Sequence, residues 1–217
     1  MNSILLRISL RNLLKNKFTS AICVLGLSLG FIAFILITLF IRYEHSWDKT
    51  NENYDRIFLV QRNIALSAQS IGSQTIVSYT PAITASLIDD FQGFERVTSV
   101  HFSNDRYLSS NQVDLLKLDQ GIYVDANYFK IFTYQFIDNF NPKDFEQPFS
   151  VALSQTMANR LFGNENPIGK SITLDKQTQL NVVGVYADLP VNSSIRPEYI
   201  ISFSTIERMN DFSQSDH

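Results

Sequence analysis

The chain has 217 residues, 45% of them hydrophobic, and a formal net charge of −3, which allows one good-sized domain or two small ones. Residues 1–41 contain no acidic residue, whereas residues 43–217 carry 13 Lys and Arg against 21 Asp and Glu, a formal charge of −8. The acidic part excludes a basic surface for nucleic acid, and the lone cysteine, Cys23, excludes a disulfide within the chain.

The first segment of the chain is basic and amphipathic. Residues 2–17, NSILLRISLRNLLKNK, repeat basic side chains at four-residue intervals, which places them on one side of a helix. We therefore predict a cytoplasmic amphipathic interfacial helix over residues 1–17, lying along the inner membrane surface. The alternative is that the charges only set the orientation in the membrane. The basic residues are Arg7, Arg11, Lys15 and Lys17.

An uncharged run follows from Phe18 to Ile41. Its 24 residues include 15 Leu, Ile, Val or Phe, and as a helix they would extend about 36 Å, against about 30 Å of hydrocarbon. The run exceeds the apolar part of a cleaved signal peptide, and no small-residue cleavage site precedes Tyr43. We predict a transmembrane helix over residues 18–42, with the N-terminus in the cytoplasm because basic residues before a span stay inside.

Two glycines lie within this span. The stretch GLSLG places Gly26 and Gly30 four positions apart on one helix face. Because missing side chains let a second helix approach closely, this face is a candidate packing site. Glycine is also generally more frequent in membrane helices, so the alternative is that the pair has no packing role.

The segment RYEHSWDKTNENYDRIFLVQR leads out of the span. Tyr43 and Trp47 occupy the position of an interfacial aromatic belt. The helix is expected to continue for one or two turns before Asn51 and Asn53 end it. IFLVQR is then expected to form a strand.

The next pattern predicts a β-α-β unit. Thr80 is a suitable N-cap, Pro81 suits the first helical position, and Gly93 ends the predicted helix. VTSVHF then returns as a strand. Such a unit needs a larger sheet to cover it.

The remaining residues alternate short strands with one clear helix, SQTMANRLFG, in which Ser154 is the expected N-cap and Met157, Leu161 and Phe162 face inward. A short turn or helix is expected at YFKIF, and strands at GIYVD, TYQFI, FSVALS, SITLD, QLNVVGVYADLP and EYIISF. The predicted fold class is α+β: one N-terminal transmembrane helix followed by an extracytoplasmic mixed α/β domain of two subdomains.

The stretch GNENPIGKS ends like a phosphate-binding loop. A Walker A loop has four residues between its glycines, but five separate Gly163 from Gly169, and here the loop follows a helix instead of opening one. We therefore predict a structural turn, in which Gly163 caps the helix and Pro167 lies in the connection.

We predict no catalytic, cofactor-binding or metal-binding residues. Nucleophile-elbow, zinc-protease and cysteine-histidine motifs are absent from the sequence. His45 with Glu44 and Asp48 offers a single imidazole, which is a weak metal site. Residues 192–194, Asn-Ser-Ser, match a glycosylation acceptor, which matters only in a eukaryotic secretory pathway.

Taken in chain order, these stretches resemble the amino-terminal region of MacB/FtsX-type ABC transporter permeases. The resemblance rests on RISLRNLLKNK with the GLSLG span, YEHSWDKTNENYDRIFLV, GIYVDANYFKIFTYQF, VALSQTMANRLFGNENPIGKSITLD and VVGVYADLPVNSS. It covers nearly the whole chain. GNENPIGK then looks like a family turn whose glycines, Gly163 and Gly169, are architectural.

The resemblance implies a noncatalytic part of a dimeric bacterial inner-membrane permease. Residues 43–217 would be a periplasmic MacB-like core domain, incomplete at its C-terminus, with 43–110 and 195–217 as a porter-like part and 111–194 as a second, inserted subdomain. ATP would be hydrolysed by a separate cytoplasmic ABC ATPase next to the basic segment Ile4 to Lys17. The movement would pass through the membrane to the outer domain, which exports or extracts substrates or acts on envelope partners.

The expected partners are this ATPase, a second permease subunit in a homo- or heterodimer, a periplasmic adaptor and the lipid bilayer, without nucleic acid. The chain stops at His217 without the family's three later helices, so we expect a fragment, a truncated product or a partial subunit. The alternative function is a single-span envelope binding or sensor module. An anchored enzyme ranks last because no cluster of catalytic residues is visible.

Overall fold

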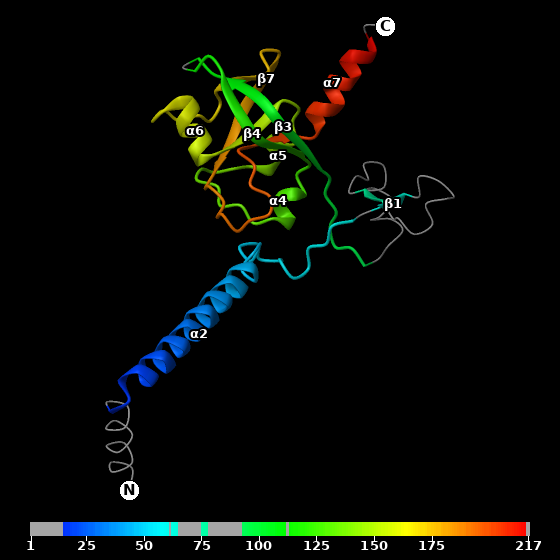
Figure 1. Ribbon diagram of the computed structural model, residues 1–217. Helices are drawn as coiled ribbons and strands as arrows, with labels where there is room; N and C mark the ends of the chain where they lie inside the picture. Colours follow the sequence, from blue (N-terminus) through cyan, green and yellow to red (C-terminus); the bar gives the residue numbers. More distant parts are fainter. Residues whose placement is uncertain (1–14, 61, 65–74, 78–92, 112, 216–217) are drawn as a thin grey trace. The chain divides into compact units, whose positions relative to one another are not determined.

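The computed structural model describes residues 15–60, 62–64, 75–77, 93–111 and 113–215. The chain divides into two compact units, Met1–Trp47 and Asp48–His217, and Figure 1 labels many of their helices and strands. Most of the predicted interfacial helix over residues 1–17 lies outside the described residues.

The first unit contains helix α2 (Lys17–Glu44), which is long and apolar enough to cross a membrane. None of its residues is buried within the chain, so its apolar surface faces outward all around, as expected of a helix surrounded by lipid. Two hydroxyls in α2 donate to the carbonyl four residues earlier: Ser28 to Val24 and Thr38 to Phe34, each at 2.8 Å. Such bonds would lower the cost of placing these hydroxyls in hydrocarbon.

Helix α2 ends earlier than the sequence pattern predicts. Instead of continuing toward Asn51, it stops at Glu44 and passes into hydrogen-bonded turns. The Ser46 hydroxyl donates to the Tyr43 carbonyl at 2.7 Å, so a side chain bonds a carbonyl of the last helical turn. Asp48 then adopts a φ of +57°, which no helix continues through.

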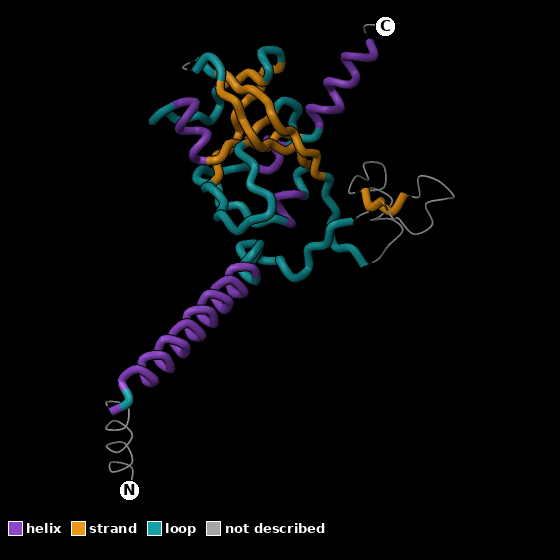
Figure 2. Tube along the Cα trace, in the orientation of Figure 1, coloured by secondary structure: helices purple, strands orange, loops and turns teal. Residues whose placement is uncertain are grey.

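The second unit is built on a closed barrel. Within the described residues its strand order is β3-β4-β8-β5-β7-β6, and Figure 2 shows these strands gathered in one body with short helices around it. The strands are β3 (Val100–Ser109), β4 (Leu116–Val124), β5 (Ser150–Ser154), β6 (Ser171–Leu174), β7 (Thr178–Tyr186) and β8 (Tyr199–Ser202).

The barrel mixes parallel and antiparallel pairs. β4 runs parallel to β8 and β5 parallel to β7, while the other neighbours are antiparallel. Parallel neighbours cannot be joined by a tight hairpin, and helix α6 (Gln155–Phe162) lies in the connection that leaves β5. The ring closes between β3 and β6, where Leu108 pairs with Leu174 and Ser109 with Thr173.

Strands β5 and β8 are buried on both faces. Every residue of both strands is buried, and successive side chains of a strand point to opposite faces. Val151 and Leu153 join a core to which all six strands and α6 contribute, whereas Ala152 joins a second core on the other face. The uninterrupted apolar runs of these strands are typical of strands covered on two sides.

The second core is an aromatic cluster. Helices α4 (Tyr128–Ile131) and α5 (Pro142–Phe145) contribute to it, and the ring of Phe129 meets those of Phe140 and Phe145 at centroid distances of 5.0 and 4.9 Å. Gly184 on β7 leaves space for it, because a Cβ there would lie 2.6 Å from the Phe140 ring. The cluster consists of Tyr128, Phe129, Phe132, Tyr134, Phe136, Phe140, Phe145 and Tyr186.

The predicted fold class is confirmed: one apolar N-terminal helix precedes a mixed α/β domain. The predicted helix SQTMANRLFG is also confirmed as α6, whose N-cap Ser154 accepts a hydrogen bond from the Met157 N–H at 3.2 Å. Met157, Leu161 and Phe162 are all buried, as the helical spacing indicates. YFKIF contains α4, and the strands predicted at SITLD and EYIISF are β6 and β8.

Three predicted strands differ from the structure. TYQFI is reduced to one bridge, Phe136 with Tyr186. In IFLVQR, residues 57–60 are not a strand, and β1 (Arg62–Ile64) begins later and pairs with β2 (Thr75–Val77). VTSVHF enters β3 only at Val100. An apolar segment becomes a strand only where a neighbour supplies backbone partners, which sequence alone does not reveal.

The expected borders at 110/111 and 194/195 pass through the barrel. β3 and β8 lie on the predicted porter-like side, β4 to β7 on the inserted side, and all belong to one closed sheet. The helix predicted between Thr80 and Gly93 falls almost entirely outside the described residues. The porter-like role of the outer segments therefore stays a prediction. After β8 the chain continues into helix α7 (Ser204–Ser215).

Candidate functional site

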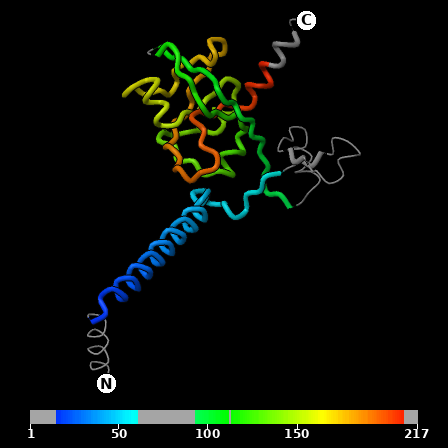
Figure 3. The backbone as a smooth tube through the Cα atoms, viewed as in Figure 1, coloured from blue at the N-terminus to red at the C-terminus, as the bar shows by residue number. Residues whose placement is uncertain are grey.

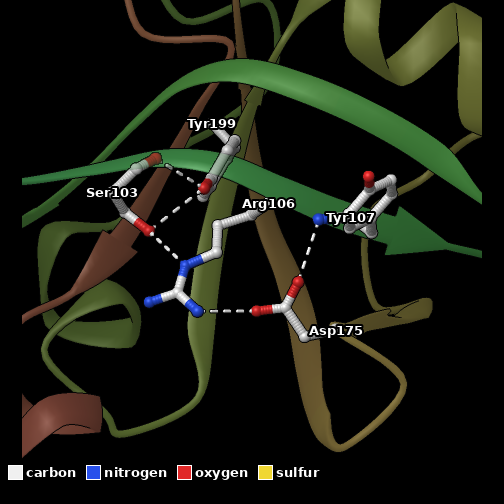
Figure 4. Close-up of polar contacts among 5 residues, drawn as sticks. All are labelled: Ser103, Arg106, Tyr107, Asp175 and Tyr199. Carbon is white, nitrogen blue, oxygen red and sulfur yellow. Dashed lines mark hydrogen bonds and ion pairs between the residues drawn. The ribbon is translucent and has the colours of Figure 1, made fainter.

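Polar contacts of β3, drawn in Figure 4, support the barrel near the point where β3 pairs with β6. The Arg106 guanidinium donates to the Asp175 carboxylate at 2.8 Å, and the Tyr107 N–H donates to the same carboxylate at 2.9 Å. The buried Tyr199 hydroxyl donates to the Ser103 carbonyl at 2.9 Å. These bonds join β3 to β8 and to the turn between β6 and β7, supplementing the short β3–β6 pairing.

Alkaline pH is expected to destabilise the barrel through its buried tyrosines. Burial raises the pKa of Tyr199 from the ordinary value of 10 to about 12, and the Ser103 hydrogen bond opposes this only in part. Burial also raises the pKa of Tyr128, Tyr134 and Tyr186. The folded state therefore holds these phenolic protons up to a higher pH than the unfolded chain does. The stabilisation that comes from Tyr199 is fully present below pH 10 and is lost as the pH rises toward 12.

The measurement is guanidinium unfolding of the full chain at about pH 9 and about pH 11.5, followed by near-ultraviolet circular dichroism. Tyr199→Phe should weaken the decrease between the two pH values, although it lowers stability at both by removing a hydrogen bond. An equally steep decrease in wild type and Tyr199→Phe would show that Tyr199 does not contribute to the pH dependence.

The candidate membrane residues lie on or beside α2. Lys15 and Lys17 are exposed, whereas Arg7 and Arg11 lie outside the described residues. At Gly26 and at Gly30 an added Cβ would meet nothing within 4 Å, so this face of the helix is open. At the C-terminal end of α2, the ring of Tyr43 contacts that of Trp47, which follows the helix, edge to face at a centroid distance of 6.2 Å.

The turn after α6 has a local geometry unlike that of a phosphate loop. Gly163 lies at the C-cap with a φ of +60°, and Gly169 has a φ of +79°, a region in which glycine is favoured. Gly169 N–H donates to the Val182 carbonyl at 2.8 Å. Lys170 pairs with Glu165 and lies over the Phe162 ring at 5.3 Å. The lysine is thus engaged with its own turn, and Pro167 lies between the two glycines.

A set of hydrogen bonds holds the start of the second unit to two distant loops of that same unit. The Asp48 N–H donates to the Asn192 carbonyl at 2.9 Å, and its carboxylate accepts from the Ser194 N–H at 2.7 Å and from the Ser194 hydroxyl. The segments concerned can be followed in Figure 3, cyan near residue 48 and orange near residue 192. We call this set the polar clamp; it consists of Asp48, Asn51, Glu52, Thr133, Asn192 and Ser194.

In the second half of the polar clamp, Thr133 both donates a hydrogen bond to the turn at Asn51 and Glu52 and accepts one from it. The Thr133 N–H donates to the Asn51 side-chain oxygen at 3.0 Å, and the Glu52 N–H donates to the Thr133 hydroxyl at 3.0 Å. Asn51 also donates to the Asp48 carbonyl, through its N–H at 3.1 Å and its side chain at 3.3 Å. The two halves are therefore joined through a single short turn.

Sequence reasoning did not identify the polar clamp. It considered Asp48 only as a metal ligand and residues 192–194 only as a glycosylation acceptor. The partners lie 146 positions apart for Asp48 and Ser194 and 82 apart for Asn51 and Thr133, so no local pattern links them. The signal present was the density of Asp and Asn in DKTNEN, residues that favour turns and bond to backbone groups.

The described residues offer little for acid–base chemistry. No group of three or more His, Cys, Asp or Glu side chains gathers among them. An open groove of about 570 Å³ lies between Asn139, Phe149 and Asn181, and its only titratable lining residue is Asp144. His45, Glu44 and Asp48 do not gather as a metal site either.

The sequence matches the MacB-like periplasmic core domain family over residues 20–216. A search of curated proteins finds no match. Among solved structures, the fold is similar to a domain of a permease protein from Porphyromonas gingivalis, with a TM-score of 0.54, 14% identity, and coverage of 61% of this chain and 56% of that one.

Two further solved structures are similar. One is the periplasmic region of MacB from Actinobacillus actinomycetemcomitans, with a TM-score of 0.46, 20% identity, and coverage of 57% of this chain and 55% of that one. The other is the extracellular domain of the ABC-type transporter YknZ from Gram-positive bacteria, with a TM-score of 0.49, 17% identity, and coverage of 61% and 67%. The chain thus spans little more than half of the first two structures.

Proposed function

Because the chain belongs to the MacB-like periplasmic core domain family, we propose that it is the noncatalytic permease portion of an ABC transporter. In this role a separate cytoplasmic ATPase hydrolyses ATP, and the resulting movement reaches the barrel unit, which exports or extracts substrates or acts on envelope partners. The family match over residues 20–216 is the observation that carries the proposal. No coenzyme or metal is assigned to the chain.

The placement in the membrane follows from the properties of α2. A helix of 28 residues with an outward apolar surface all around suits insertion into a bilayer about 30 Å thick. We propose an inner-membrane location, with the basic residues Arg7, Arg11, Lys15 and Lys17 on the cytoplasmic side near the ATPase. The barrel unit then lies in the periplasm.

The glycine face of α2 supports a helical partner. Since a Cβ at Gly26 or Gly30 would meet no other part of the described chain within 4 Å, another helix can approach the backbone there. We assign this face to packing against the rest of the permease, as a homo- or heterodimer. A periplasmic adaptor is a further proposed partner, and nucleic acid is not, because residues 43–217 are acidic.

The test is purification of the complex from its native membrane through a tag on this chain. We expect an ABC ATPase to copurify and the complex to hydrolyse ATP. Protease added outside spheroplasts should cut the barrel unit but not the N-terminal segment. A tagged, unrelated single-span protein from the same membrane is the control and should bring down no ATPase.

A second candidate is a single-span envelope binding or sensor module, in which α2 would be the membrane anchor. This module is supported if no ATPase copurifies with the chain and the adjoining DNA encodes no further membrane helices. That result would contradict the transport proposal.

A further inference from the structure

The polar clamp fastens the start of the second unit to the barrel by a path shorter than the chain itself. Along the chain, Val100, the first residue of the barrel strands, is 52 positions after Asp48. The hydrogen bonds of the polar clamp reach the barrel unit within the five residues from Asp48 to Glu52.

The hydrogen bonds of Asp48 provide a much shorter connection. Asn192 and Ser194 lie in the loop between β7, which ends at Tyr186, and β8, which begins at Tyr199. Asp48 is thus bonded to a loop whose two ends are barrel strands. Since Asp48 directly follows Trp47, the first residue of the second unit is also the first residue to be fastened.

The second half of the polar clamp leads to the aromatic cluster. Thr133 bonds Asn51 and Glu52, and the next residue, Tyr134, shares a hydrogen bond with the Tyr128 hydroxyl at 2.8 Å. The rings of Tyr134 and Tyr186 contact edge to face at 5.1 Å. A force on Asp48–Glu52 therefore reaches two packed parts of the barrel unit.

We propose that the polar clamp is the fastening through which movement of the membrane helix is transmitted to the barrel, with Asp48 as the positioning residue. This inference rests on the proposed function, since it assumes that such movement occurs. The movement of α2 would then reach the barrel through the hydrogen bonds to the β7–β8 loop and to Thr133. It would not depend on the covalent path through residues 53–99.

The chemistry of Asp48 suits this role. Its φ of +57° lies in a region that Asp and Asn adopt more readily than most residues. Its carboxylate accepts both the N–H and the hydroxyl of Ser194, and hydrogen bonds to an ionised acceptor are stronger than neutral ones. Asparagine would keep the conformation and one acceptor, but its amide N–H could bond the Ser194 hydroxyl only as a donor, and the charge would be lost.

Asp188 offers a matched control. Its carboxylate makes the same kind of contact, accepting the Thr156 N–H at 3.1 Å and the Thr156 hydroxyl at 2.7 Å. Both aspartates therefore bond the backbone and hydroxyl of one Ser or Thr in the barrel unit. Only Asp48 stands at the start of that unit, so only its loss should release the connection.

The test measures the distance between spin labels at Lys49 and Asn159, both exposed, in the full chain in lipid nanodiscs without ATPase and with Cys23→Ala. We expect a narrow distribution in wild type, at least about twofold broader in Asp48→Gly because both bonds to Ser194 are lost and glycine frees the backbone of the turn, and intermediate in Asp48→Asn. Asp188→Gly should match wild type. Circular dichroism of each variant verifies that the barrel is folded.

Three results would overturn the proposal: a broad wild-type distribution, no change in Asp48→Gly, or equal broadening in Asp188→Gly. If Asp48→Gly does not fold, the distance distributions of Asp48→Asn and Asp188→Asn are compared instead. Equal widths in these two variants would overturn the proposal. Amide exchange gives a second readout, because the Ser194 N–H should exchange about tenfold faster or more in Asp48→Gly once its acceptor is removed.

The complex with its ATPase separates this inference from the proposed function. There, Asp48→Gly should retain ATP hydrolysis within about twofold, because the polar clamp is remote in sequence from the basic segment. It should lose any nucleotide-dependent change in the Lys49 to Asn159 distance. A complex without ATPase contradicts the proposed function, whereas a nucleotide-dependent change that persists in Asp48→Gly contradicts the role of the polar clamp.

Discussion

Gly121→Ala is expected to destabilise the barrel by about 3 kcal/mol, the upper range for inserting a methyl group into a packed core. Gly121 on β4 lies between Ser103 on β3 and Tyr199 on β8 in the sheet register. The Tyr199 ring crosses this position, so an added Cβ would lie 1.9 to 2.4 Å from three ring atoms. The measurement is guanidinium unfolding of the full chain in detergent, followed by near-ultraviolet circular dichroism.

The Tyr199 ring has little freedom to move away from this methyl group. Its hydroxyl donates to the Ser103 carbonyl at 2.9 Å, so moving the ring breaks a buried hydrogen bond. Gly93→Ala is the matched control, because a Cβ there meets nothing within 4 Å. The double variant Gly121→Ala with Tyr199→Leu should lose less stability than the two single changes added together, since the smaller side chain relieves the overlap. Wild-type stability of Gly121→Ala would refute this account of the barrel.

Phe145→Ala should cost about 3 to 5 kcal/mol, the range for truncating a fully buried aromatic residue. Phe145 ends α5 and is completely buried, with its ring 4.9 Å from Phe129 and 6.1 Å from Phe140. Its removal leaves a cavity in the core cluster to which Ala152 and Ile200, from strands buried on both faces, also belong. The same unfolding assay reports the change, and tyrosine signals in the near ultraviolet report loosening of the aromatic cluster.

Phe102→Ala is the control for this prediction. Phe102 lies on β3 with 47% of its surface exposed, so its truncation removes little buried area and should cost about 1 kcal/mol or less. If both phenylalanine variants lose equal stability, the aromatic cluster is not the second core of the domain. Neither change touches the polar clamp, so loss of barrel stability and release of the clamp can be measured separately.

The sequence by itself determined the features that depend on neighbouring residues. The uncharged run predicts α2 to within a few residues at each end, because membrane insertion depends on length and composition. Ser154 and the buried Met157 and Leu161 of α6 follow from capping and from a period of 3.6 residues. The resemblance likewise depended on local stretches in a fixed order, and the family match over residues 20–216 confirms it.

Only the tertiary structure decided how these segments pair. The barrel closes through β3 with β6 and through the parallel pairs of β4 with β8 and β5 with β7, and a strand's own sequence does not name its neighbour. The need for glycine at position 121 arises from a ring 78 positions away. From its local sequence Asp48 is only a turn residue, and its bond to Ser194, 146 positions later, is visible only in the folded structure. Capping and periodicity act over one or two helical turns, whereas these contacts require the chain to be folded first.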